Sequence, residues 1–180
     1  NTNSQCFLDV DFLGGRQGYG TFIIDITNPY VTTGADRVRA IGFAKWRWGS
    51  HNTTISPDGN YIYNSNQDLE PKYQIEVFDI SGANLTNPQL VAQMPLQTGA
   101  GPHDITFNAS GTRAYSAAIS QTLVLDTTNP EQPRIIGQVV DPAINVVHQA
   151  DPVTMTRPDG SQRELLVITD ERAGAAASAE

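Results

Sequence analysis

The chain has 180 residues, 39% of them hydrophobic, and its 11 basic and 19 acidic side chains give a net charge of −8. This length and composition predict a globular unit with a real hydrophobic core, and the acidic balance argues against nucleic-acid partners, whose phosphates would be repelled. No apolar run is long enough to cross a bilayer as a helix, so we expect no membrane span.

The sequence of residues 1–48 is typical of the last part of a first repeated unit. It contains the strand-like segment "TFIID", which ends at Asp25. Cys6 is the only cysteine in the chain, so an internal disulfide and a cysteine-based metal site are both excluded. Its thiol is either free and buried, as lone cysteines tend to be, or half of a bridge to a partner outside this chain.

Two complete units are predicted next, at 51–98 and 103–141, and 148–171 is typical of the first half of a further unit. Each complete unit contains four short β-rich segments, and successive units begin about 45 to 50 residues apart. No segment has the pattern of a long amphipathic helix, and the alanine-rich residues 172–180 predict a flexible tail.

Each unit from residue 51 onward begins with a histidine and then reaches a tight-turn sequence that ends in glycine. The turns are "SPDG" ending at Gly59, "NASG" ending at Gly111 and "RPDG" ending at Gly160. Glycine accepts a positive φ cheaply, so these sequences predict hairpin turns between antiparallel strands.

A later segment of three units ends in aspartate, at Asp25, Asp79 and Asp126, directly before a turn that contains Thr or Ser. We interpret these carboxylates as acceptors for the backbone amides of their turns. Four short strands per repeat predict an all-β fold made of β-propeller blades of four antiparallel strands. About three blades cannot close a ring, so we expect further blades or partner chains to complete a larger propeller.

These segments resemble the LVIVD-repeat and YVTN-type bacterial surface β-propellers over about residues 20–171. The "LVIVD" position holds "FIID", "EVFD" and "LVLD", "DTTNPEQPRIIGQV" matches the end of the repeat, and "PHDITFNASGTRAY" resembles its beginning. The resemblance implies a propeller fold and an extracellular, periplasmic or cell-surface location. It also implies membership of a group that holds binding and adhesion modules alongside a few enzymes.

The three histidines of the chain, His51, His103 and His148, occupy the same place in successive units. The innermost strand of a blade lines the central channel, so histidines at its start are predicted to face one axis. Converging neutral imidazoles suit Zn, Cu or Fe. The alternative is that each histidine packs against the next blade and bonds a backbone carbonyl.

Several neighbours of the histidines are candidates for ligand or supporting roles. Carboxylates can orient metal-binding imidazoles or act as bases, whereas strand-end aspartates commonly cap backbone amides. Trp46 and Trp48 can stack on a planar ligand at the channel mouth or pack between blades. The carboxylate candidates are Asp104, Asp151, Asp170 and Glu171.

Two functions remain open from the sequence. The first is a secreted or surface propeller that presents a rigid platform for a protein or glycan ligand. The second is an enzyme with a histidine-lined site on the propeller axis, either a metal-dependent oxidoreductase or a lactonase-like hydrolase. The segment "FDISGANLTNPQLVAQM" loosely resembles the selenium-binding protein and methanethiol oxidase group, which favours a metal cofactor.

Overall fold

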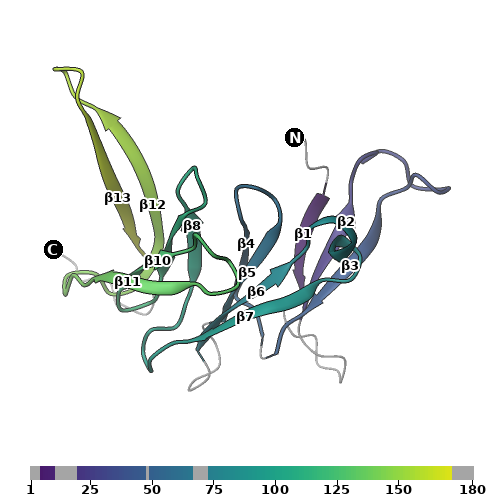
Figure 1. Ribbon diagram of the computed structural model, residues 1–180, viewed down its shortest axis with the longest axis horizontal. Coiled ribbons are helices and arrows are strands. Elements are labelled where there is room, and N and C mark those ends of the chain that lie inside the picture. The colour runs from purple at the N-terminus through teal and green to yellow at the C-terminus, as the bar shows by residue number, and fades with distance from the viewer. Residues whose placement is uncertain (1–4, 11–19, 48, 67–72, 172–180) are drawn as a thin grey trace, which may run out of the picture.

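The computed structural model describes residues 5–10, 20–47, 49–66 and 73–171. Most of these residues form antiparallel strands, and the strands are grouped into four sheets that stand side by side along the molecule (Figure 1). Among the described residues, the helical structure is limited to one short 3-10 turn, η1 (Gly82–Leu85), between two strands.

The two central sheets each have four strands in chain order, which is the meander of a propeller blade. The first central sheet consists of β4 (Asn52–Ile55), β5 (Tyr61–Asn66), β6 (Gln74–Asp79) and β7 (Gln89–Pro95). The second consists of β8 (Asp104–Phe107), β9 (Arg113–Ala117), β10 (Thr122–Asp126) and β11 (Arg134–Val139).

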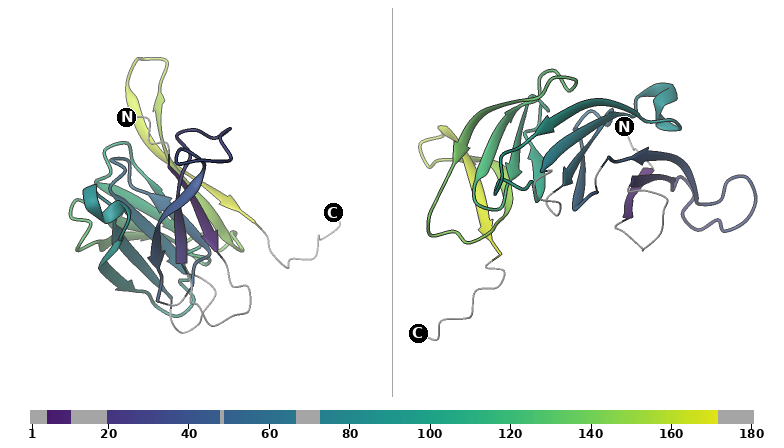
Figure 2. Two further views of the ribbon diagram at one scale, coloured as in Figure 1. Left: turned by 90° about the vertical axis from the view of Figure 1, so that its right-hand side faces the viewer. Right: turned by 90° about the horizontal axis from the view of Figure 1, so that it is seen from below.

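The two outer sheets are incomplete blades. The N-terminal sheet has the order β1 (Gln5–Val10), β2 (Gly20–Asp25) and β3 (Arg39–Lys45). The C-terminal sheet is the hairpin of β12 (Val147–Thr156) and β13 (Gln162–Asp170), which extends away from the rest of the molecule in Figures 1 and 2. The architecture is therefore a partial β-propeller, as the sequence predicted.

The first strands of successive blades lie next to one another. β4 contacts β8, and β8 contacts β12. These strands occupy the innermost position of each blade, so they form the wall that faces the propeller axis.

The predicted hairpin turns are present after the first strand of three blades. Gly59, Gly111 and Gly160 all have a positive φ, of 75°, 70° and 83°. The amide of each donates to the carbonyl three residues earlier, at 2.8, 3.0 and 2.9 Å. The repeated glycines are thus explained by a backbone conformation that other residues adopt only with strain.

The strand-end aspartates act as predicted within their own turns. The carboxylate of each accepts the backbone N–H two residues later, from Thr27 to Asp25 at 3.0 Å, from Ser81 to Asp79 at 2.7 Å and from Thr128 to Asp126 at 3.1 Å. Just before each aspartate, the pairing with the next strand shifts register, as in a β-bulge. The aspartates therefore end the strands at a bend and satisfy the turn amides.

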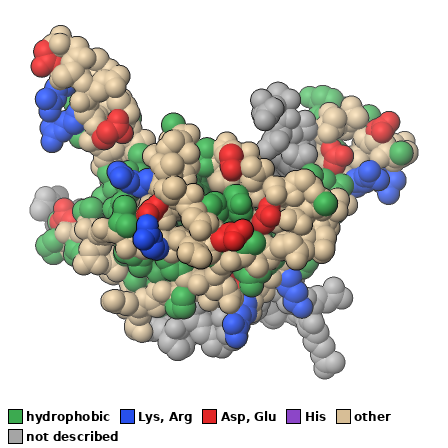
Figure 3. Space-filling view, viewed as in Figure 1, with side chains coloured by type: hydrophobic (Ala, Val, Ile, Leu, Met, Phe, Trp, Pro, Cys, Tyr) green, Lys and Arg blue, Asp and Glu red, His purple; other side chains and the backbone are tan. Residues whose placement is uncertain are grey.

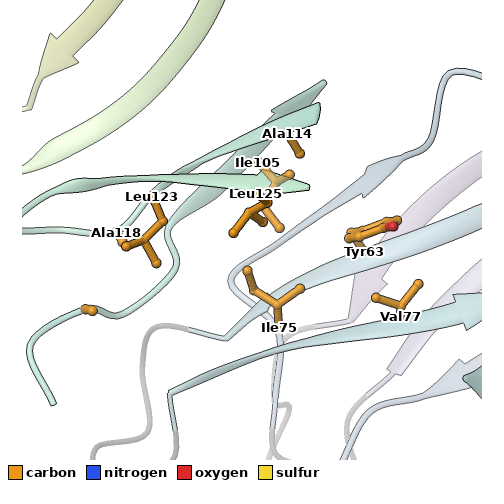
Figure 4. Packing of buried hydrophobic residues seen from close by; sticks show 9 residues of the cluster. Tyr63, Ile75, Val77, Ile105, Ala114, Ala118, Leu123 and Leu125 are labelled. Carbon is orange, nitrogen blue, oxygen red and sulfur yellow. The ribbon is translucent and has the colours of Figure 1, made fainter. Parts of the chain in front are cut away.

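The main hydrophobic core lies between the two central sheets. Tyr63, Ile75 and Val77 face Ile105 and Leu125 across the interface between blades (Figure 4). A second core joins the N-terminal sheet to the first central sheet, and Gly42 on β3 lets the backbone carbonyl of Leu85 approach closely there. Burial of apolar side chains between blades stabilises the stack.

The face drawn in Figure 3 carries charged side chains of both signs among hydrophobic and other residues, without a continuous basic surface over the described part. This distribution agrees with the acidic composition. In the described residues, no helix has the length and apolar character needed to pass through a bilayer.

Candidate functional site

The backbone places the three histidines at equivalent ends of the innermost strands. His51 and His103 directly precede β4 and β8, and His148 is the second residue of β12. The amide of His51 donates to the carbonyl of Ser65 at 2.7 Å, and the amide of His103 donates to that of Ala117 at 2.6 Å. Both histidines are therefore fixed by the neighbouring strand of their own blade.

The imidazole side chains converge across the blades. Nε2 of His51 lies 3.1 Å from Nε2 of His103, so one of these nitrogens donates and the other accepts. The ring centroids of His51 and His103 are 4.2 Å apart, and those of His103 and His148 are 4.6 Å apart. His103 thus occupies the middle of a row of three imidazoles.

Glu171 joins this row from the end of the C-terminal hairpin. Its Oε2 lies 3.6 Å from Nε2 of His103 and 3.6 Å from Nδ1 of His148. β13 pairs with β12, and the amide of Glu171 donates to the carbonyl of Val146 at 3.1 Å, which fixes the backbone beside His148. We call His51, His103, His148 and Glu171 the axial cluster.

The axial cluster has a buried side and an open side. His103 is buried, whereas the side chains of His148 and Glu171 are 47% and 43% exposed. Burial lowers the pKa of His103, the neighbouring His51 and His148 lower it further, and the Glu171 carboxylate opposes this shift. His103 is therefore neutral near pH 7, and its Nε2 faces both His51 and Glu171.

Asp104 and Asp151 lie beside the cluster on the inner strands. Oδ1 of Asp104 accepts a hydrogen bond of 2.7 Å from the amide of Asn52 on the preceding blade. Oδ1 of Asp151 accepts from Thr106 Oγ1 at 3.1 Å and from Gln149 Nε2 at 3.2 Å. Burial raises the pKa of Asp104, and the nearby carboxylate of Asp151 raises it further.

Asn52 was not among the candidates drawn from the sequence. A signal for it was present, because Asn52 follows His51 just as Asp104 follows His103. Its hydrogen bond to Asp104 links two blades directly beside the imidazoles.

Asp170 serves at least partly as a strand-end cap, since its Oδ1 accepts the backbone N–H of Val146 at 3.1 Å. This contact holds the ends of the hairpin together next to Glu171. The capping alternative left open for Asp170 by the sequence is thus present in the structure.

Trp46 is in the hydrophobic core, which corrects its placement among the candidate ligand-stacking residues. Only 2% of it is exposed, its ring packs edge-on against Phe78 with centroids 4.8 Å apart, and Nε1 donates to Thr21 Oγ1 at 2.8 Å. An indole with both faces covered cannot stack on a ligand. Trp48 lies outside the described residues.

The arrangement of the axial cluster supports two kinds of chemistry. Neutral imidazoles beside a carboxylate can accept and return protons. The same side chains are the common ligands of divalent transition metals.

Comparison with solved structures supports the propeller fold. The chain superposes on a periplasmic gluconolactonase from Pseudomonas aeruginosa with a TM-score of 0.58 and 14% identity, over 92% of this chain and 47% of that one. A putative 6-phosphogluconolactonase from Bacteroides uniformis gives a TM-score of 0.56 and 14% identity, over 97% of this chain and 53% of the other. The chain thus spans about half the length of these structures.

A similar fold also occurs in a structure described as a protein complex. A structure described as a complex of KlAtg21 with the coiled coil of AgAtg16 matches with a TM-score of 0.56 and 14% identity, over 93% of this chain and 48% of that one. At such low identity these similarities show the fold alone. No protein-family model and no curated protein sequence matches the chain.

Proposed function

We propose that the protein containing this chain is a lactone hydrolase whose reaction takes place at the axial cluster. The observation that carries the proposal is the convergence of three imidazoles and one carboxylate at one end of the innermost strands. In propellers, this end of the inner strands borders the central channel, where a small substrate can enter.

The structural neighbours favour lactones among the possible substrates. Two of the matched propellers are described as a gluconolactonase and a putative 6-phosphogluconolactonase. Another structure of similar fold is described as a complex with a coiled coil, so the fold by itself does not select an activity. The proposal therefore depends on the side chains of the axial cluster and uses the neighbours only to choose the substrate class.

The chemistry requires a group that moves a proton. A water molecule attacks the lactone carbonyl carbon, and His51 accepts the proton that the water loses. The bond between the carbonyl carbon and the ring oxygen then breaks, and the imidazolium of His51 returns its proton to that oxygen. The product is an open-chain hydroxy acid, and no oxidant or reductant is needed.

The neighbours of His51 support this role. Its Nε2 contacts the neutral His103 at 3.1 Å, so its ring is oriented by a buried partner. The exposed side of the cluster, formed by His148 and Glu171, leaves a route for water and substrate. General acid–base catalysis by such a group typically accelerates a reaction 10²- to 10⁴-fold.

The test compares lactone hydrolysis by the purified protein containing this chain with hydrolysis by its His51→Gln variant. Glucono-1,5-lactone is the probe, and acid release is followed by pH-stat after subtraction of spontaneous hydrolysis. We expect His51→Gln to lower the rate on the order of 100-fold. The matched control is Asp159→Asn at the exposed hairpin turn, where the Asp159 carboxylate accepts from the backbone N–H and the hydroxyl of Ser161, and it should keep the rate.

Two results would overturn the proposal. Wild-type protein that hydrolyses neither glucono-1,5-lactone nor 6-phosphogluconolactone above the buffer rate would favour the binding-platform function. Hydrolysis that is unchanged in His51→Gln would place the reaction elsewhere on the protein.

A further inference from the structure

We infer that His103, His148 and Glu171 bind one divalent transition-metal ion, with zinc as the reference case. The claim that the ion binds depends on the ligand geometry alone. The claim that it is a cofactor for lactone hydrolysis rests on the proposed function. The sequence pointed to a ring of three histidines, and the structure favours a different set of ligands in which Glu171 takes the place of His51.

The distances between the donor atoms support this set. One ring nitrogen of His103, one ring nitrogen of His148 and one carboxylate oxygen of Glu171 all lie within 4.8 Å of one another. Both contacts of Glu171 Oε2 with the imidazole nitrogens are 3.6 Å. Ligands at about 2.0–2.2 Å from zinc, arranged tetrahedrally, are separated by about 3.3–3.6 Å. The Glu171 contacts already match this spacing.

The third pair of ligands, His103 and His148, can reach the required spacing without a change in the fold. The imidazoles of His103 and His148 need to approach by at most about 1.5 Å to reach the tetrahedral spacing. His148 has an exposed side chain at the open side of the cluster, so rotation of its ring can supply this movement, while the buried His103 stays in place.

His51 lies outside this set. Its nitrogen is 3.1 Å from His103 Nε2, but it does not belong to the group of donors that are all within 4.8 Å of one another. An ion on His103 Nε2 would take the place of the hydrogen bond to His51, because one ring nitrogen cannot serve both. We therefore place His51 next to the ion without binding it, which is where a base for metal-bound water would be needed.

The ligand types fit a reactive rather than a structural metal. Two histidines and one carboxylate are the ligands of many catalytic zinc sites, in which the fourth position is left for water or substrate. Such an ion would polarise the lactone carbonyl and lower the pKa of a bound water. The carboxylate makes the site more negative than a ring of histidines, which favours a divalent cation over an anion.

The experiment is a calorimetric titration of Zn²⁺ into the metal-free purified protein containing this chain, with Co²⁺ as a spectroscopic probe. We expect one ion per chain and visible Co²⁺ absorption bands of tetrahedral intensity. Glu171→Gln and His148→Gln each remove a direct ligand, so each should weaken Zn²⁺ binding by more than the roughly 10- to 100-fold typical of changing an outer partner of a ligand. His51→Gln removes no ligand and should weaken binding less than either of them, and Asp159→Asn should not change it.

The circular dichroism spectrum and melting temperature of each metal-free variant check that the variant is folded. Glu171→Gln is the deciding variant, since the side chain is partly exposed and its replacement keeps the shape. Absence of stoichiometric binding in the folded wild-type protein, or equal affinity in Glu171→Gln, would overturn the inference. A loss in His51→Gln as large as that in His148→Gln would instead establish the ring of three histidines.

The proposed metal site and the proposed hydrolysis can be rejected independently of each other. Stoichiometric Zn²⁺ binding that depends on Glu171, in a protein without lactone hydrolysis, would support the metal site and reject the proposed function. Hydrolysis that depends on His51 and persists at full rate in the metal-free protein, which binds no Zn²⁺, would do the reverse.

Discussion

Two sets of repeated residues behave differently in this molecule. The histidines at the start of the innermost strands come together across blades, with His51 and His103 in contact at 3.1 Å. The aspartates at the ends of the third strands form hydrogen bonds within their own blades, as Asp79 does with Ser81 and Asn84. Both sets recur about once per repeat, yet only one of them builds a shared site.

The difference follows from the distance of each position from the propeller axis. Inner strands of successive blades are neighbours, so equivalent side chains on them meet. Strands farther out diverge from one another, and equivalent side chains there serve their own turns. A repeated polar residue is therefore evidence for a site only where the fold brings its copies together.

The largest expected effect is on lactone hydrolysis, which should depend on the repeated histidines and not on the repeated aspartates. His103→Gln removes the central imidazole, which is a proposed metal ligand and lies beside His51, and we expect lactone hydrolysis to fall more than 100-fold. Asp79→Asn leaves the cluster intact and should keep hydrolysis within about twofold. Steady-state rates on glucono-1,5-lactone, with melting temperatures as folding controls, check this. An equal loss of hydrolysis in both variants would contradict the distinction between the two sets of residues.

The next effect concerns hydrogen bonds that cross blades. Asn52→Ala removes the donor 2.7 Å from the partly buried Asp104, and we expect it to lower the free energy of unfolding by about 2 kcal/mol. Asn60→Ala removes an exposed amide that bonds Asp58 within one turn at 2.9 Å, and should cost about 0.5 kcal/mol or less. Urea unfolding of both variants measures the difference, and similar values would show that crossing the blades adds nothing.

The repeated turn glycines provide a smaller effect. Gly160→Ala places a side chain at a φ of 83° in open space, and should cost about 1 kcal/mol. Gly111→Ala faces the same strain, and its new Cβ would also lie 3.3 Å from Pro57 of the preceding blade. We expect the melting temperature to fall further in Gly111→Ala. A larger fall in Gly160→Ala would mean that the turn at Gly111 can shift away from Pro57 without cost.

The smallest effect is the acid response of one aspartate. Hydrogen bonds from Thr128, and then the contact with Arg134, lower the pKa of Asp126 from 3.8 to about 2. A carboxyl whose pKa is depressed by folding stabilises the protein above its unfolded pKa, and this contribution is lost as the pH falls from about 4 to about 2. Asp126→Asn should therefore lower the melting temperature at pH 5 but match the wild type near pH 2. A constant difference would contradict this assignment.

The fold was predictable because its signals are local. A glycine with positive φ, such as Gly59, is required by a hairpin turn, and an aspartate such as Asp126 is required by its own turn amides. Both requirements can be recognised from short sequences. The convergence of the histidines also followed from their place on the inner strands, once four strands per repeat had been recognised.

The details of the candidate site were less accessible. Trp46 lies in a core and not beside a ligand, because the side of a strand on which an indole lies depends on packing between blades. The contacts of Glu171 depend on β12, which has a register shift between Val147 and Gln149 and so turns His148 relative to its neighbours. Spacing along the chain carries no information on such a shift or on which imidazole nitrogen faces the axis.

The meander of the sheets also has a consequence for how the protein folds. Every paired strand in the described sheets joins a strand consecutive in the chain, from β1 with β2 to β12 with β13. Short loops lose little entropy on closing, so each blade can form its own ladder before distant residues meet. The contact between His51 and His103 joins different blades, and so we expect it among the last to form. Assembly of the axial cluster would then report that the blades have docked.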